Sequence, residues 1–260
     1  MNRLTTLFQT KTENLLNVYF TAGYPQLDST ETIIRSLADA GADLIEVGVP
    51  YSDPMADGET IQKSSMQALK NGMTLDTLFS QLRSARKHTE VPMVLMGYFN
   101  QVMQYGPERF CKAAREAGVD GLILPDLPVF EYEHEFKAIA EKHDLQITFL
   151  ITPQTSDERI RKIGALSTGF IYVVSSSSIT GKSGEISEEQ KDYFARIAAL
   201  DLPQPRLIGF GISDAKSFYT ACDYANGAII GSAFIRALAG KEDVSSATSA
   251  FVEGILSPVN

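Results

Sequence analysis

A glutamate stands inside an apolar run of this chain, DLIEVG at 43–48. In a strand, successive side chains point to opposite faces, so Glu46 shares one face with Leu44 and Gly48. If the other face packs against helices, Glu46 points into an enclosed interior. Loss of hydration there raises the pKa of a carboxyl group, because water stabilises mainly its charged form. Glu46 is therefore a candidate for proton transfer near neutral pH.

The alternative for Glu46 is a structural role, in which a lysine or arginine holds the buried carboxylate. No strand-like segment of the chain supplies an obvious basic partner, which favours a catalytic role. Asp57 follows in the loop segment MADGET. Taken alone it is typical of a turn or a helix N-cap. Directly above Glu46, however, a second carboxylate would be placed to accept an N–H from a bound substrate.

The elements that must position these carboxylates follow a simple alternation. Eight short apolar runs recur, most of them too apolar for half-exposed strands and typical of strands covered on both faces. They are LNVYFTAG (16–23), DLIEVG (43–48), PMVLMGY (92–98), GLILPD (121–126), QITFLI (146–151), FIYVVS (170–175), RLIGFG (206–211) and GAIIGS (227–232). Each is followed by a helical pattern. The connection after the second run contains two, ETIQKSSMQALKNG and TLDTLFSQLRSARKH, which predicts an extra helix there.

Eight β/α units in about 250 residues predict a (β/α)8 TIM barrel with additional helices, since a doubly wound open sheet usually has fewer strands. No Gly/Ser-rich or Pro-rich linker interrupts the chain, so we expect a single barrel domain over 1–260. In such barrels the active site lies at the carboxyl ends of the strands. Glycines there could hold a phosphate: Gly211 in GFGIS, and Gly231 with Ser232 in GSAF. Tight turns and a helix N-cap are the plainer alternatives.

The segment SSSSITGKSGEIS at 175–187 contains Gly181, Lys182 and Ser183, the second half of a nucleotide-binding P-loop. Ser176 occupies the position of the first glycine of that motif, so we favour a polar loop that closes over the site. The sequence shows no G-x-S-x-G elbow and no plausible Ser/His/Asp set, which disfavours nucleophilic hydrolysis.

Composition excludes several classes of protein. Lys+Arg 23 against Asp+Glu 32 gives a formal net charge of -9 without a basic stripe, so nucleic acid is not an expected partner. No apolar run is long enough to span a membrane, and the N-terminus does not resemble a signal peptide. Cys111 and Cys222 are expected to be reduced thiols of a cytoplasmic protein. His88, His134 and His143 lack the spacing of a metal site.

The run LIEVGVPYSDPMADG at 44–58 resembles the signature of the tryptophan synthase α chain family, whose fold is a (β/α)8 barrel. The resemblance continues through FTAGYP, ETIQ, PDLP at 125–128, GFGIS and GSAF, and so covers nearly the whole chain. It implies a carbon-carbon lyase of tryptophan biosynthesis that cleaves indole-3-glycerol phosphate to indole and D-glyceraldehyde 3-phosphate by a retro-aldol step. It also implies an αββα heterotetramer, in which the β chain carries pyridoxal phosphate and this chain carries no cofactor.

The same resemblance assigns roles to individual residues. Glu46 matches the general acid/base, and Asp57 matches the carboxylate that holds the indole N–H. An apolar setting would make Glu46 basic enough to move protons, and a polar loop would keep Asp57 ionised. The resemblance places the remaining site residues as follows: Phe20, Tyr98, Tyr172 and Phe210 around the indole and glycerol, Thr180, Gly181, Gly211, Gly231 and Ser232 around the phosphate and the closing loop, and Asp53 and Pro54 at the interface with the β chain.

Two other functions remain open at this point. A neighbouring indole-glycerol-phosphate synthase would use a lysine in the barrel mouth, and no strand here supplies one. A non-catalytic subunit that only binds and activates a β chain would not need both carboxylates. Within the closing loop, Ser178 stands where the family commonly has glycine.

Overall fold

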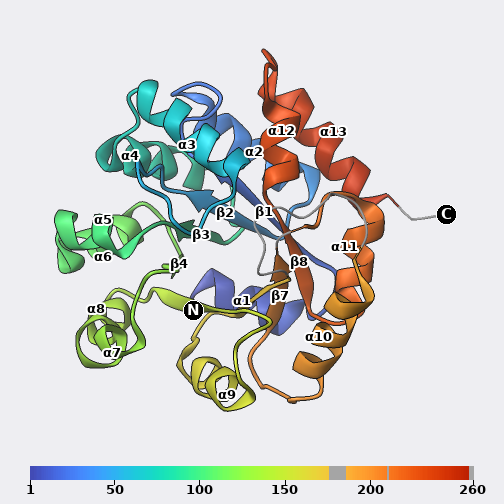
Figure 1. The fold of residues 1–260 in the computed structure, drawn as a ribbon. Coiled ribbons are helices and arrows are strands. Elements are labelled where there is room, and N and C mark those ends of the chain that lie inside the picture. The colour runs from blue at the N-terminus through green and yellow to red at the C-terminus, as the bar shows by residue number, and fades with distance from the viewer. Residues whose placement is uncertain (176–185, 210, 258–260) are drawn as a thin grey trace.

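Eight parallel strands form one closed barrel in which each strand pairs with the next in sequence, and the eighth pairs with the first. The computed structural model describes residues 1–175, 186–209 and 211–257, with helices packed around the strands (Figure 1). The strands are β1 (Leu15–Thr21), β2 (Leu44–Gly48), β3 (Met93–Met96), β4 (Gly121–Ile123), β5 (Gln146–Ile151), β6 (Ile171–Val174), β7 (Arg206–Gly209) and β8 (Gly227–Ile230). The predicted TIM barrel is confirmed.

The strands are buried along almost their whole length, and every residue of β1 and β2 is buried. This explains why the apolar runs in the sequence do not alternate with polar residues: one face of each strand fills the barrel and the other packs under helices. Polar residues within such a strand are consequently buried too. Asn17 and Glu46 are both 0% exposed.

Helices occupy the connections as the sequence patterns predict. The long connection between β2 and β3 contains α3 (Glu59–Lys70) and α4 (Leu75–Arg86), which confirms the extra helix. The other helices that follow β1 are α2 (Ser29–Ala40), α5 (Phe99–Tyr105), α6 (Pro107–Glu116), α7 (Val129–Glu131), α8 (Lys137–Lys142), α9 (Asp157–Leu166), α10 (Glu188–Ala198), α11 (Ala215–Cys222), α12 (Ser232–Leu238) and α13 (Val244–Leu256). A π-helical turn, Tyr132–Phe136, joins α7 to α8.

One helix has no counterpart in the predicted pattern. The polar N-terminus forms α1 (Arg3–Thr10). Its N-cap is Asn2, whose side chain accepts a hydrogen bond from the Leu4 N–H. The Asn2 amide donates to the carbonyl of Asp120 at 2.9 Å. Leu4 is 0% exposed and lies against Gly121, where a side chain would crowd it. The helix therefore closes the barrel at the amino ends of the strands.

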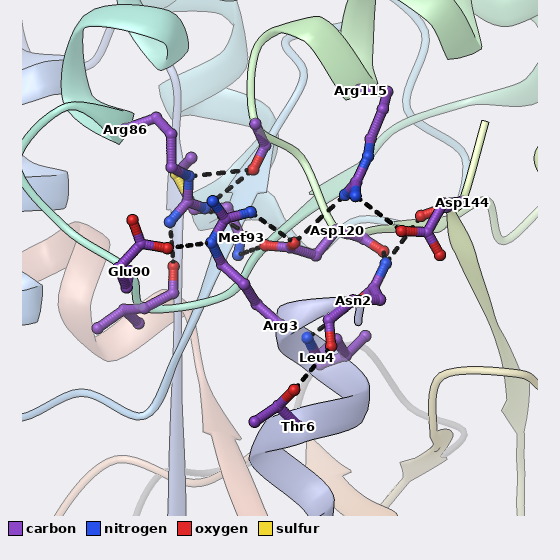
Figure 2. Close-up of polar contacts among 12 residues, drawn as sticks. Asn2, Arg3, Leu4, Thr6, Arg86, Glu90, Met93, Arg115, Asp120 and Asp144 are labelled. Atoms are coloured by element: carbon purple, nitrogen blue, oxygen red, sulfur yellow. Dashed lines mark hydrogen bonds and ion pairs between the residues drawn. The ribbon is translucent and has the colours of Figure 1, made fainter.

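A cluster of charged side chains secures this closed end (Figure 2). Asp120, 0% exposed, immediately precedes β4 and lies within 3.3 Å of Arg3 from α1 and 3.3 Å of Arg86 from α4. Arg115 from α6 lies 3.7 Å away, and the Met93 N–H donates to the same carboxylate at 3.0 Å. Because several elements converge on one acid, the cluster ties helices to strands.

No helix within the described ranges is both long enough and apolar enough to cross a membrane.

Candidate active site

Glu46 lies on β2, in register with Tyr19 of β1. Its carboxylate accepts one hydrogen bond, from the Asn17 amide to Oε2 at 2.8 Å. The other oxygen, Oε1, is buried and has no hydrogen-bond partner among the residues that the structure describes. Buried polar atoms are rarely left in this state, so an unpaired carboxylate oxygen marks a position where a ligand could bind.

Burial raises the pKa of Glu46 from its ordinary value of 4.5 to about 8. The hydrogen bond from Asn17 lowers the pKa, because it favours the charged form, and the negative charge of Asp57 raises it. Within the described part of the chain, Asp57 is the only charged group that acts on this pKa, and no basic side chain does. A carboxyl group in this state exchanges protons near neutral pH.

Asp57 lies in the loop between β2 and α3 and is 7% exposed. Tyr98, which follows β3, donates its hydroxyl proton to Asp57 Oδ2 at 3.2 Å and accepts the Ala56 N–H at 2.9 Å. Burial raises the pKa of Asp57 to about 6, while the bond from Tyr98 lowers it. The loop is therefore less solvated than the sequence suggests. Asp57 still ionises at lower pH than Glu46, which is the expected order.

Two tyrosines share the interior with the carboxylates. The negative charges of Glu46 and Asp57 act on Tyr19 from β1 and on Tyr172 from β6, and raise both pKa values in addition to burial. A Cβ at Gly48 would overlap the Tyr19 hydroxyl, and a Cβ at Gly209 would overlap that of Tyr172. Glycine at these two strand ends therefore makes room for the rings.

The structure does not bring Phe20 to the carboxylates. On β1 it lies between Tyr19 and Thr21 and so points to the opposite side from Asn17, Tyr19 and Thr21. Tyr19 occupies the interior position instead. Strand alternation could have found this from the sequence: a strand whose Asn17 faces Glu46 must also turn Tyr19 inward. Asn17 was missed although an amide within an apolar run is itself unusual.

Three of the residues expected near the phosphate lie at the carboxyl ends of β7 and β8. Gly211 follows β7 with a φ of 81°, a backbone conformation that suits glycine, and is exposed. Gly231 precedes α12 and Ser232 is its first residue; both are partly exposed. Thr180 and Gly181, which are also expected near the phosphate, lie outside the described residues, as do Ser178, Lys182 and Ser183. Phe210, which is expected near the indole and glycerol, lies outside them too.

Asp53 and Pro54 lie in the same loop as Asp57. Asp53 is exposed and Pro54 partly exposed, and Met55 beside them is 85% exposed. Tyr51, at the start of this loop, stacks on Tyr98 with ring centroids 4.9 Å apart. The loop therefore presents one side to solvent and the other to the carboxylates. Among the described residues, no group of three or more His, Cys, Asp or Glu side chains is arranged to hold a metal ion.

Comparison with known proteins identifies the family of this chain. The family model described as tryptophan synthase alpha chain matches residues 5–255. The tryptophan synthase alpha chain of Parabacteroides distasonis is 50% identical over 255 residues, which cover 98% of this chain and 99% of that protein. The corresponding protein of Flavobacterium johnsoniae is 55% identical over 238 residues, or 92% of this chain and 94% of the relative.

Solved structures give the same result. A tryptophan synthase complex from Pyrococcus furiosus contains a chain that is 35% identical, with a TM-score of 0.86 over 95% of this chain and 99% of that one. A tryptophan synthase structure from M. tuberculosis has a TM-score of 0.85 at 29% identity, covering 98% of both chains. With a matching family model, relatives at half identity and the barrel in common, this chain belongs to the tryptophan synthase alpha chain family.

Proposed function

We propose that this chain cleaves indole-3-glycerol phosphate to indole and D-glyceraldehyde 3-phosphate, as a carbon-carbon lyase. The observation that carries the proposal is Glu46: a fully buried carboxyl group with a pKa of about 8, one oxygen of which has no partner among the residues that the structure describes. The reaction needs a group that both gives and takes a proton at neutral pH. The identity of the substrate is inferred from membership of the family.

Glu46 would act first as an acid and then as a base. Its proton goes to C3 of the indole ring, and the ring nitrogen becomes positively charged. The resulting carboxylate then takes the proton of the adjacent hydroxyl group, whose oxygen becomes the carbonyl of the aldehyde. The electron pair of the broken carbon-carbon bond returns to the ring, so Glu46 ends the cycle protonated.

Asp57 would accept the indole N–H and stabilise the positive charge that develops on the ring. This role requires an ionised carboxylate at neutral pH, and a pKa of about 6 meets the requirement. Tyr98 supports it by donating to Oδ2. Tyr172 and, in place of Phe20, Tyr19 would line the indole and glycerol pocket, together with Phe210.

The phosphate would lie between the loops that follow β7 and β8, where Gly211, Gly231 and Ser232 offer backbone N–H groups and space for a close approach. Thr180 and Gly181 would contribute from the loop after β6. One barrel domain over 1–260 suffices for this chemistry, and we propose a cytoplasmic location, where the free thiols Cys111 and Cys222 would stay reduced.

The partner would be a β chain that carries pyridoxal phosphate, in an αββα assembly to which indole is passed. The family name implies such a partner. Exposed apolar side chains also support it: Met55 follows β2, Met103 lies on α5 after β3, and Phe130 lies on α7 after β4. These neighbouring loops, with Asp53 and Pro54, would form the interface.

Indole release from indole-3-glycerol phosphate by the purified chain, with and without a β chain, tests this function. We expect slow release that a β chain accelerates. Glu46→Gln should lower turnover by roughly 10² to 10⁴, the range for loss of a general acid/base. The matched control is Glu59→Gln, the same change at an exposed residue of α3, which should leave turnover unchanged.

Near-normal turnover of Glu46→Gln would refute the mechanism. Activation of a β chain without any indole release would favour the purely regulatory subunit instead.

A further inference from the structure

Asn17 is the one side chain in the described residues that donates a hydrogen bond to Glu46. Both residues are 0% exposed and lie on adjacent strands, Asn17 on β1 and Glu46 on β2. A neutral amide buried within an apolar strand loses hydration, and this loss is offset only by the bonds it makes. Such a residue has a cost to stability, which suggests that its bond to Glu46 serves function.

The pattern of unpaired atoms supports this view. Within the described residues, Glu46 Oε1 and Asn17 Oδ1 are both buried without a partner, while Oε2 and Nδ2 bond to each other. One carboxylate oxygen is thus held, and the other is left for substrate. If Glu46 takes up a proton, the amide also offers an acceptor, because an amide carries both donor and acceptor groups. A lysine or arginine at this position would serve the ionised form alone.

We propose that Asn17 is a positioning residue for Glu46: it holds Oε2 through its amide N–H, so that Oε1 is presented to the reacting atoms. This inference rests on the proposed function. Asn17 would not touch the reacting atoms itself. It would act by keeping the Glu46 side chain in one orientation. A displacement of a catalytic group by about 1 Å can lower the rate by up to about 100-fold.

The bond also has an electrostatic effect. Among the described residues, the titratable groups that interact electrostatically with Glu46 are Tyr19 from β1, Tyr172 from β6 and Asp57 from the loop after β2. Of these, Asp57 is the acid and opposes ionisation of Glu46, whereas the Asn17 N–H favours it. Removal of the amide donor should therefore raise the pKa of Glu46. The side chain would then release its proton to C3 less readily.

Two variants of similar size separate the donor from the volume of the side chain. Asn17→Leu removes both polar atoms, and Asn17→Asp keeps the shape but replaces the amide by a second acid. The matched control is Thr148→Val, which removes a buried hydroxyl group of β5 whose contacts include the Phe170 N–H and neither carboxylate. The full chain is used throughout, with indole-3-glycerol phosphate as substrate.

For Asn17→Leu we expect kcat to fall about tenfold at pH 7 with KM changed less than about twofold, because orientation rather than substrate binding is lost. The alkaline limb of kcat/KM, which belongs to Glu46, should move up by about one pH unit, the scale of one hydrogen bond to a charged group. Asn17→Asp should move it further. Thr148→Val should leave the limb in place. Equal losses in both Asn17 variants with an unmoved limb would overturn the proposal, since they would indicate a packing role only.

A second measurement does not depend on activity. Protein enriched in ¹³C at the glutamate side-chain carboxyl can be titrated by NMR, with Glu46 assigned as the resonance that Glu46→Gln removes. The midpoint should rise in Asn17→Leu and stay unchanged in Thr148→Val. If wild-type protein releases no indole, the proposed function fails, and this titration still decides whether Asn17 controls Glu46. If indole is released but neither the midpoint nor the limb moves, only the inference about Asn17 fails.

Discussion

Two carboxylates, Glu46 and Asp120, are both 0% exposed, yet their surroundings are opposite. Asp120, at the amino ends of the strands, is surrounded by three arginines and a backbone N–H (Figure 2). Glu46 lies on β2, which leads to the loops at the other end. Within the described part of the chain it accepts one hydrogen bond, from the neutral amide of Asn17, and the negative charge of Asp57 raises its pKa. A buried carboxyl group is thus surrounded by positive charges at one end of the barrel, whereas at the other end no cation in the described part of the chain interacts with it.

The difference follows from what each charge must do. A buried carboxylate surrounded by cations binds its neighbours together, which suits the closed end, where Asp120 links α1 to β3 and β4. A buried acid without a cation instead holds its proton to higher pH, at a cost to the stability of its charged form. Such an acid can both give and take a proton near neutral pH. The barrel thus separates stability from reactivity along its axis.

The strongest test compares turnover after removing the charge at each end of the barrel: the change at Glu46 should lower it greatly, and the change at Asp120 should not. Glu46→Gln should lower the turnover of indole-3-glycerol phosphate by roughly 10² to 10⁴. Asp120→Asn should keep turnover within about threefold of wild type at 20 °C while the protein remains folded, since it lies at the other end of the strands. Steady-state indole release by both variants checks this. If Asp120→Asn lowers turnover as much as Glu46→Gln while its circular dichroism is unchanged, the proposed separation between a structural end and a reactive end is wrong.

Stability should respond in the opposite way. Asp120→Asn should lower the free energy of unfolding by about 3 to 5 kcal/mol, because it leaves Arg3, Arg86 and Arg115 around a neutral group. Urea unfolding followed by circular dichroism measures this. Glu90→Gln is the control: it breaks the contact of Arg3 with an exposed acid, which water screens, so its effect should be far smaller. Equal losses of stability in the two variants would show that the buried cluster around Asp120 contributes no more to stability than an exposed ion pair.

The dependence of stability on pH sharpens the contrast. Folded Glu46 keeps its proton up to about pH 8, whereas in the unfolded chain it loses the proton near pH 4.5. Between these values the native state binds more protons, so this group makes stability fall as pH rises. Glu46→Gln lacks the effect. Relative to wild type, it should gain about 2 to 3 kcal/mol between pH 6 and pH 8, at about 1.4 kcal/mol per unit. A difference that stays constant over this range would contradict the raised pKa.

The smallest effect concerns the second carboxylate of the site. Tyr98→Phe removes the hydroxyl group that favours ionised Asp57, so the pKa of Asp57 should rise above about 6. The acid limb of kcat/KM should then move up by about half a pH unit to one pH unit, with a loss of about two- to sixfold at pH 6. Tyr51→Phe keeps the ring that stacks on Tyr98 and should leave the limb unchanged. A limb that does not move would show that the bond does not control Asp57.

Much of this protein was predictable from local patterns. The apolar runs and the helical patterns between them predicted the barrel and the extra helix after β2, because a buried strand and an amphipathic helix each leave a periodic trace. Glu46 stood out because a charge inside an apolar run has few explanations. Family resemblance added Asp57, which on its own looked like a turn residue. The inward position of Tyr19 rather than Phe20 required the phase of the strand to be read as well.

Residue types and short-range spacing are enough to predict the order of strands and helices, the carboxylate on β2 and the family. Which residues surround each charge depends on contacts between distant segments, and these are visible only in the folded chain. Asn17 meets Glu46 because β1 and β2 are paired in one register, and α1, which has little signal of its own, is held at the closed end by Asp120. The pKa of a buried group depends on its burial and on the charges and hydrogen bonds around it, and several distant segments of the chain contribute to each of these.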